Sequence, residues 1–298
     1  MLIRFRILIL LAALGVNSSF AQRYPTLKHV EVRARVTYDS PTKFFYYDYS
    51  LTNDAKNAGT IIEFGVDISR GPNSVLYDSI GLQFAGIGFM ESDYRSSYPV
   101  LGARVLPVGF LSLPPGWISF WGNMPEASVM KDRAFIAPGQ SVSGIVLMSK
   151  GLPGIRNCVA RPDFEVDRYF PDMDSPAADS LDADQMDSIM DACNYYGPTV
   201  GPWAPDANFL PIVFLDTLSS FIGQARTFNW IHSDKPAEKY LGYLDETRIL
   251  LLSNKKSEAN DILRTILRDA DVDSSSVITD EAYGLIRYNT EYLADKLK

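Results

Sequence analysis

The chain has 298 residues, of which 46% are hydrophobic and 21% are charged, and its formal net charge is −8. These values are typical of a globular protein of one or two domains, and they exclude a disordered chain, a collagen-like repeat and a multi-span membrane protein. The negative charge disfavours nucleic acid and anionic membrane surfaces as partners, because binding to phosphates requires clustered lysine and arginine.

Residues 1–21 have the pattern of a secretory signal peptide. Arg4 and Arg6 precede a short apolar stretch, and Ser19 and Ala21 lie where signal peptidase accepts small residues. The apolar stretch is shorter than the roughly 20 residues that cross a bilayer. We therefore expect cleavage near Ala21 and a secreted or periplasmic mature protein without a membrane span. A buried N-terminal helix is the alternative.

Residues 22–156 show the alternation typical of antiparallel β-strands. From Val30 to Tyr38, apolar side chains alternate with polar ones, and a period of two recurs over 44–52 and 60–69. Further strands are expected over 104–110, 116–122 and 141–149. Many short strands separated by turns rich in proline and glycine predict an antiparallel β-sandwich.

Residues 209–298 have the spacing of amphipathic helices. Apolar residues recur at intervals of three and four in four segments, one of which runs from Ser257 to Arg268. Four helices joined by short loops predict a small bundle. The expected fold class is therefore α+β, with an N-terminal antiparallel β-sandwich domain over 22–156 and a C-terminal helical bundle domain over 209–298.

Two segments resemble known modules. The run YLDETRILLLSNKKSEANDILRTILRDADVDSSSVITDEAYGLIRYNTEYLADKL, from Tyr243 to Leu297, resembles the helical module of FIMAH type that ends many secreted bacterial proteins. This resemblance implies an accessory or adhesion role rather than a catalytic one. The segment IAPGQSVSGIVLMSKGLPG, from Ile136 to Gly154, resembles the closing strand of β-sandwich modules in uncharacterised secreted bacterial proteins, and it implies no activity.

Between the two expected domains, residues 157–208 have the composition of an acidic connector. They carry 2 basic and 11 acidic residues. They also hold the only two cysteines of the chain, Cys158 and Cys193. An even number of cysteines in an exported protein favours a disulfide, which would close a loop around most of the acidic residues. Two free thiols are the alternative.

One loop-like spacing suggests a calcium site. Asp269, Asp271, Asp273, Ser275 and Asp280 occupy positions 1, 3, 5, 7 and 12 of an EF-hand-like loop between two expected helices. The spacing departs from that pattern because the sixth position is not glycine and the twelfth is not glutamate. Asp280 is equally well explained as a helix-start residue. The sequence predicts no cofactor, and calcium at this loop is the alternative.

Three aromatic residues are candidates for ligand binding. Tyr46 lies on the face of its strand opposite the other tyrosines, and Trp117 and Trp121 lie on a later strand. Exposed together, such rings would form a stacking platform for a sugar or a peptide. The alternative is that both faces of these strands are covered and the rings belong to the core.

Catalytic chemistry finds little support in the sequence. The chain has only two histidines, His29 and His232, and it lacks a phosphate loop, a dinucleotide fingerprint, a CxxC pair and an HExxH motif. We expect an exported, non-catalytic protein that binds an extracellular protein or a glycan. A calcium-dependent or glycan-binding module is one alternative, and a secreted hydrolase that uses a carboxylate pair is the other.

Overall fold

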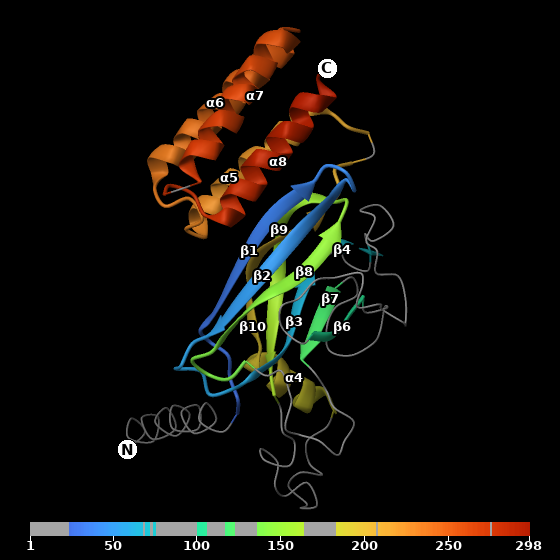
Figure 1. Ribbon diagram of the computed structural model, residues 1–298, viewed down its shortest axis with the longest axis vertical. Coiled ribbons are helices and arrows are strands. Elements are labelled where there is room, and N and C mark those ends of the chain that lie inside the picture. The colour runs from blue at the N-terminus through green and yellow to red at the C-terminus, as the bar shows by residue number, and fades with distance from the viewer. Residues whose placement is uncertain are drawn as a thin grey trace, which may run out of the picture.

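The computed structural model describes residues 24–67, 69–71, 74–75, 100–105, 117–122, 136–163, 183–206, 208–274 and 276–298. The expected signal peptide, residues 1–21, lies outside these residues, as does most of the acidic stretch from 164 to 182. The described part has strands followed by helices, so the expectation of an α+β protein is confirmed (Figure 1).

The strands form antiparallel sheets. The three-stranded sheet has the order β1-β2-β8, with β1 at Val30–Asp39, β2 at Phe44–Asn53 and β8 at Ser141–Ser149. The five-stranded sheet has the order β10-β9-β3-β7-β6, with β10 at Tyr195–Trp203, β9 at Leu152–Pro162, β3 at Ile61–Asp67, β7 at Trp117–Gly122 and β6 at Val100–Val105. The short strands β4 (Ser69–Gly71) and β5 (Ser74–Val75) pair with each other.

Tyr49 connects the two larger sheets. It lies on β2 and is fully buried, and its ring lies 5.3 Å from that of Phe64 on β3 with the planes tilted by 61°. Its hydroxyl donates a hydrogen bond to the carbonyl of Val200 on β10, at 3.0 Å. Burial raises the pKa of Tyr49 well above its usual value, so the hydroxyl keeps the proton that it donates.

The range 157–208 is more than a connector. It contains the end of β9, the helix α4 (Ala183–Cys193) and all of β10, which pairs with β9 so that Cys158 lies opposite Gly197. The sequence pattern of β10 includes two prolines, and prolines in a sheet are confined largely to edge strands, where no ladder hydrogen bond is lost. Because β10 is the edge of its sheet, these prolines are tolerated. They also interrupt the alternation of apolar and polar residues by which a strand is recognised in a sequence.

The expectation of helices in the C-terminal part of the chain is confirmed. The helices are α5 (Pro211–Thr227), α6 (Asp234–Leu252), α7 (Lys256–Asp273) and α8 (Asp280–Lys296). In α7 the buried residues Ala259, Leu263, Ile266 and Ala270 follow the spacing of three and four. Within the described part of the chain, none of the helices is both long and apolar enough to cross a membrane.

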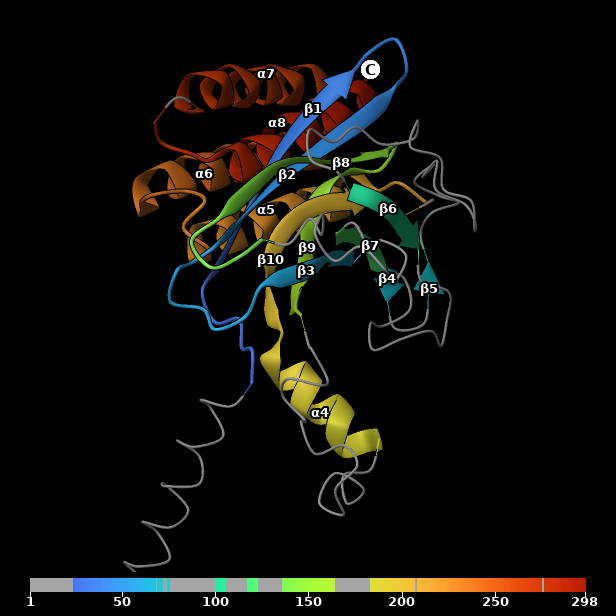
Figure 2. The same cartoon turned by 60° about the horizontal axis from the view of Figure 1, so that its bottom comes forward.

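The helix α8 covers the free edge of β1 (Figures 1 and 2). The backbone N–H of Ala34 donates to Oε1 of Glu281 at 2.8 Å, and the hydroxyl of Tyr288 donates to the carbonyl of Val36 at 3.3 Å. Gly284 permits the close approach, because a Cβ there would lie 3.1 Å from the Val36 side chain. An edge strand exposes unpaired N–H and C=O groups, and α8 satisfies two of them.

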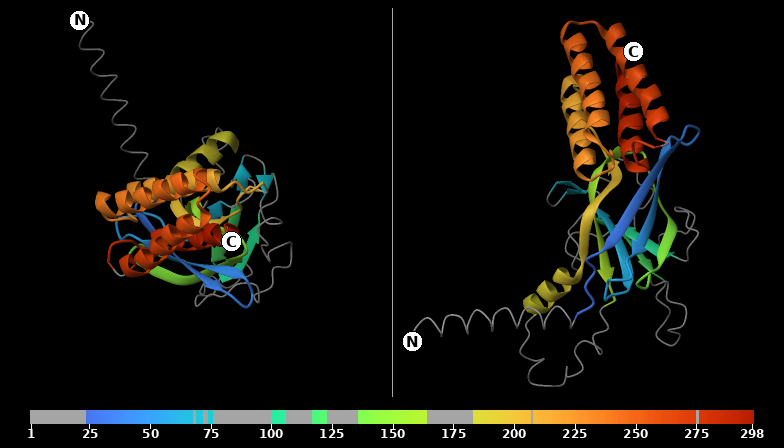
Figure 3. Two further views of the ribbon diagram at one scale, coloured as in Figure 1. Left: turned by 90° about the horizontal axis from the view of Figure 1, so that it is seen from above. Right: turned by 90° about the vertical axis from the view of Figure 1, so that its left-hand side faces the viewer.

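The strands and the helices share one hydrophobic core. Viewed from the side, the bundle stands at one end of the sheets, with α8 nearest the strands (Figure 3). A second polar contact fixes the junction, because Nδ2 of the buried Asn289 donates to the carbonyl of Pro153 on β9 at 2.8 Å. Any pocket at this junction is therefore built from both parts of the chain.

Candidate functional site

The expected disulfide is wrong, because Cys158 and Cys193 are both free and buried. Cys158 lies opposite Gly197, which is four residues beyond Cys193. Cys193 is the last residue of α4 and lies outside the β9–β10 ladder, which begins at Tyr195, so the pairing that holds Cys158 beside Gly197 does not bring Cys193 to it. Burial raises the pKa of Cys158 to about 12 and that of Cys193 to about 11, so neither thiol is a nucleophile at neutral pH.

The EF-hand-like loop does not form. Asp269, Asp271 and Asp273 lie on α7 rather than in a loop, and Asp280 begins α8, while Ser275 lies outside the described residues. The helix continues because the buried Ala270 extends its apolar stripe by a further turn. In the part of the chain that the structure describes, no group of three or more histidine, cysteine, aspartate or glutamate residues is placed to hold a metal ion.

The α7 carboxylates instead join α7 to α6. Oδ2 of Asp273 accepts hydrogen bonds from Nζ of Lys239 at 2.5 Å and from the hydroxyl of Tyr240 at 2.6 Å. Asp269 accepts from the hydroxyl of Tyr243 at 3.1 Å and lies 3.5 Å from Lys239. Burial and the hydrogen bond to Asp273 raise the pKa of Tyr240, so the phenol stays a donor. The spacing that suggested calcium thus serves helix packing.

The three aromatic candidates are not brought together. Tyr46 is half-buried on β2, in the three-stranded sheet, where it lines an open hollow of about 510 Å³ with Arg35 and Asp48. Trp117 and Trp121 lie on β7, in the five-stranded sheet. Their side chains lie outside the description, so the structure leaves their part in binding as a prediction.

The two histidines lie at the surface of the described part of the chain. His29 and His232 are both exposed. The backbone carbonyl of His29 accepts a hydrogen bond from Nδ2 of Asn57, and the backbone N–H of His232 donates to the carbonyl of Val277. Neither imidazole has a hydrogen bond to a serine hydroxyl among the described residues.

The cavity with the features of a ligand site lies where α8 meets the strands. We call it the aromatic groove. Its volume is about 370 Å³, and its walls come from the tips of β1, β2 and β8, from the start of β9, from the end of β10 and from α8. Five aromatic and four charged residues dominate its lining: Tyr38, Phe45, Trp203, Tyr288, Tyr292, Lys43, Lys150, Glu291 and Asp295.

The rings of the aromatic groove pack against other aromatic rings. The ring of Phe45 lies 4.8 Å from that of Tyr38 and 5.3 Å from that of Tyr288. On the other side, Phe214 lies 5.8 Å from Trp203 and 5.4 Å from Tyr292. Tyr38 is 42% exposed, whereas Phe45 is 7% exposed. The rings therefore form one packed wall. Tyr38 is the most exposed of the five rings.

Charged side chains of both signs lie at the rim of the aromatic groove. Lys43 lies in the turn between β1 and β2 with a positive φ of 60°, and Lys150 follows β8, where its Nζ lies 5.4 Å above the ring of Phe44. Glu291 and Asp295 are exposed on α8, four residues apart and so on the same face of that helix. The rim thus has hydrogen-bond donors near the sheet and acceptors on the helix.

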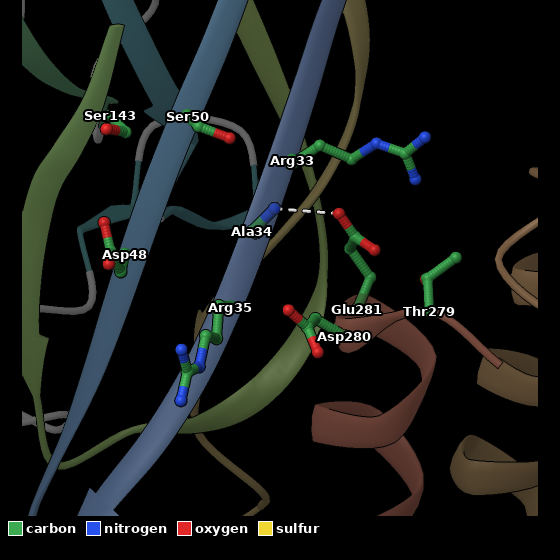
Figure 4. A pocket seen from close by; sticks show the side chains of 9 residues that line it. All are labelled: Arg33, Ala34, Arg35, Asp48, Ser50, Ser143, Thr279, Asp280 and Glu281. Carbon is green, nitrogen blue, oxygen red and sulfur yellow. Dashed lines mark hydrogen bonds between the residues drawn. The ribbon is translucent and has the colours of Figure 1, made fainter. Parts of the chain in front are cut away.

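A second, more polar pocket of about 290 Å³ lies at the start of α8, beside β1 (Figure 4). In Figure 4 the carboxylate of Glu281 points toward β1, with Arg33 and Arg35 on either side of the contact. Arg33 is paired with Glu31 at 2.6 Å. Burial raises the pKa of Asp48, which also lines this pocket. Because its most buried carboxylate binds Ala34, we assign this pocket to the junction between α8 and the sheet.

The residues of the aromatic groove were not predicted from the sequence. They come from four stretches that are far apart in the chain, near residues 38–45, 150–152, 203–205 and 288–295. The spacing of Tyr288 and Tyr292 on one helix face was the one available signal, and it is equally typical of a buried stripe.

Comparisons of the chain with protein-family models, with curated proteins and with solved structures found no match. Function therefore has to be argued from the geometry of the described residues.

Proposed function

We propose that this chain is an exported, non-catalytic binding protein whose ligand occupies the aromatic groove. The observation that carries the proposal is a pocket at the junction of the helices and the strands, lined by five aromatic and four charged residues. Ligand pockets in proteins have this composition, and they form preferentially between packed units of a chain. An extracellular protein or a glycan is the expected partner class.

The two carboxylates of the groove are placed for ligand contacts. Glu291 and Asp295 are both exposed on α8, and Asp295 is paired with Lys298 at 2.6 Å. Exposed carboxylates at the rim of a pocket can accept hydrogen bonds from a ligand. This supports binding as the proposed role of the groove.

The architecture is part of the proposal. We propose that the three-stranded and five-stranded sheets are the two layers of a β-sandwich, which is supported by the contact of Tyr49 with Phe64 and Val200 between them. We also propose that α6, α7 and α8 form an accessory module of FIMAH type, supported by their apolar stripes and short loops. Such a module would present the groove rather than act on a substrate.

Export is tested by the mass of the mature protein. With the full chain expressed in a bacterium, we expect it in the extracytoplasmic fraction with an N-terminus at Gln22, because Ser19 and Ala21 suit signal peptidase. Mass spectrometry of the fractionated protein measures both. A chain that stays in the cytoplasm with its first 21 residues attached would contradict export.

The site is tested by fragment screening, which assumes no ligand class. We expect small fragments with a flat apolar face to shift the NMR signals of Tyr38, Gly151 and Trp203 in the mature protein. The variant Tyr38→Ala should weaken these fragments, whereas Tyr196→Ala should not, because Tyr196 has a similar exposure of 47% but lies on β10 away from the groove lining. Fragments that bind only elsewhere, or none that bind, would contradict the proposal.

A further inference from the structure

The polar tips of two rings in the aromatic groove are already used within the protein. Nε1 of Trp203 donates to the carbonyl of Pro153 at 2.9 Å, and the hydroxyl of Tyr288 donates to the carbonyl of Val36 at 3.3 Å. What these residues can offer a ligand is therefore their ring surface. The face of an aromatic ring carries partial negative charge, and it attracts the weakly positive C–H groups on the flat face of a sugar ring.

The rim has charged groups of both signs. Lys43 and Lys150 are donors only, whereas the carboxylates of Glu291 and Asp295 are acceptors, and Asp295 also binds Lys298. A strongly acidic ligand would meet the two carboxylates, and a strongly basic one would meet the two ammonium groups. Neutral hydroxyls suit both sides of the rim, because each hydroxyl can donate to a carboxylate or accept from an ammonium group.

A proline-rich peptide is the competing occupant of an aromatic-lined groove. Such a peptide lacks N–H groups at its prolines and offers mainly carbonyls, so it needs donors on the protein. The indole N–H of Trp203 and the hydroxyl of Tyr288 are committed to backbone carbonyls of the chain itself. The rim offers Lys43 and Lys150 as donors to such carbonyls, but it also has the carboxylates of Glu291 and Asp295. A run of prolines has no N–H to donate to these carboxylates, whereas sugar hydroxyls donate and accept. The mixed rim therefore favours a sugar over that peptide.

We infer that the aromatic groove binds a neutral oligosaccharide, which rests on the proposed function of the groove as a ligand site. The rings of Tyr38 and Trp203 provide the stacking surface, whereas the ring of Tyr292 already has Nζ of Lys296 above it at 5.3 Å. Lys150 and Glu291 bind the hydroxyls from opposite sides of the groove. A volume of about 370 Å³ is near the lower end of the range for ligand pockets, so the site takes a short oligosaccharide or the end of a longer one.

The experiment uses the mature protein, residues 22–298, on an array of neutral and charged glycans, followed by calorimetry with the neutral hexasaccharides of glucose, xylose and mannose. We expect at least one neutral hexasaccharide to bind. Its dissociation constant should change less than about twofold between low and high salt, because no net charge is neutralised. A proline decapeptide is titrated in parallel and should not bind.

Variants connect the binding to the groove. Tyr38→Ala should weaken the hexasaccharide about tenfold or more, and Lys150→Ala, a change at an exposed side chain that leaves the core intact, about threefold to tenfold. Tyr196→Ala is the matched control and should stay within about twofold.

Three results would overturn the saccharide inference. The first is binding of the decapeptide or of charged glycans only. The second is a hexasaccharide whose affinity is unchanged by both groove variants. The third is the absence of any binding sugar while apolar fragments still occupy the groove; that result would leave the proposed function standing. If the fragments also fail to occupy the groove, the proposed function fails together with the inference.

Discussion

Glu281 is the side chain through which the helical bundle holds the edge of the sheet. Its Oε1 accepts the N–H of Ala34 at 2.8 Å, and the residue is only 2% exposed. The substitution Glu281→Ala leaves that N–H buried without an acceptor, which costs about 1–3 kcal/mol. Because Oε2 of Glu281 has no partner among the described residues, its removal recovers part of the loss. We expect a net loss near 2 kcal/mol.

Thermal unfolding of the mature protein measures this loss. For a domain of this size, about 2 kcal/mol corresponds to a fall in Tm of roughly 4–8 °C. Glu281→Gln keeps a carbonyl oxygen in place and should lose less than half as much. Glu258→Ala is the matched control, because Glu258 also lies in the first turn of a helix but its side chain is 56% exposed. It should change stability by less than about 0.5 kcal/mol.

Equal effects of Glu281→Ala and Glu258→Ala would refute the assignment. They would mean that Glu281 acts only as an acidic residue at a helix start, where the helix dipole favours negative charge. The contact with Ala34 would then contribute nothing measurable to the junction. A larger loss for Glu281→Gln than for Glu281→Ala would be equally contrary, because the amide retains an acceptor for the strand.

Three further predictions concern packing, thiols and pH. Gly284→Leu should destabilise the protein by about 1–3 kcal/mol, because the added side chain meets β1. Gly242→Leu has open space around it and should stabilise the protein slightly. Urea unfolding measures both variants. A thiol reagent should react with Cys158 and Cys193 only after unfolding in denaturant without a reductant, and two thiols should then be counted; a count of zero would show a disulfide. Burial raises the pKa of Asp48, so the folded state favours its protonated form, and the ionised group lowers stability as pH rises through that pKa. Asp48→Asn should therefore raise Tm at pH 7, and the gain should vanish below the usual aspartate pKa of about 3.9. An equal gain at both pH values would contradict this.

The helices could be predicted because each one buries a single stripe. The stripe of α7 runs through Ala259, Leu263 and Ile266, and its next position is Ala270. The same period includes Ala270, and it predicts that the aspartates on either side of Ala270 lie on a helix. The EF-hand spacing is satisfied by any helix with acidic residues at alternate positions, so it carries no information about loop geometry.

The strand β1 could be predicted because its buried and exposed residues alternate, whereas β10 was missed. Its sequence has Pro198 and Pro202 and no clean alternation, which an edge strand allows. The same gap explains the wrong disulfide, because only the pairing of β10 with β9 shows how far Cys193 lies from Cys158. The number of cysteines in a sequence does not show how far apart they lie in the fold.

The aromatic groove lies beyond the reach of sequence patterns for a physical reason. Its walls form only when α8 packs on β1 and brings Tyr288 and Tyr292 beside Phe45 and Trp203. Each ring taken alone is an ordinary amphipathic or core residue. The site is a property of the junction, whereas Tyr46 lies on β2 outside the lining of the aromatic groove.

Amide hydrogen exchange tests most directly whether α8 and β1 form one unit that builds the groove. We expect the N–H of Ala34, which donates to Glu281, to exchange as slowly as the amides in the buried face of α8, since both are released only when the junction opens. Exchange of Ala34 within seconds, as at a free sheet edge, with α8 still protected, would show that the helices do not hold the strand and that the aromatic groove has no fixed wall.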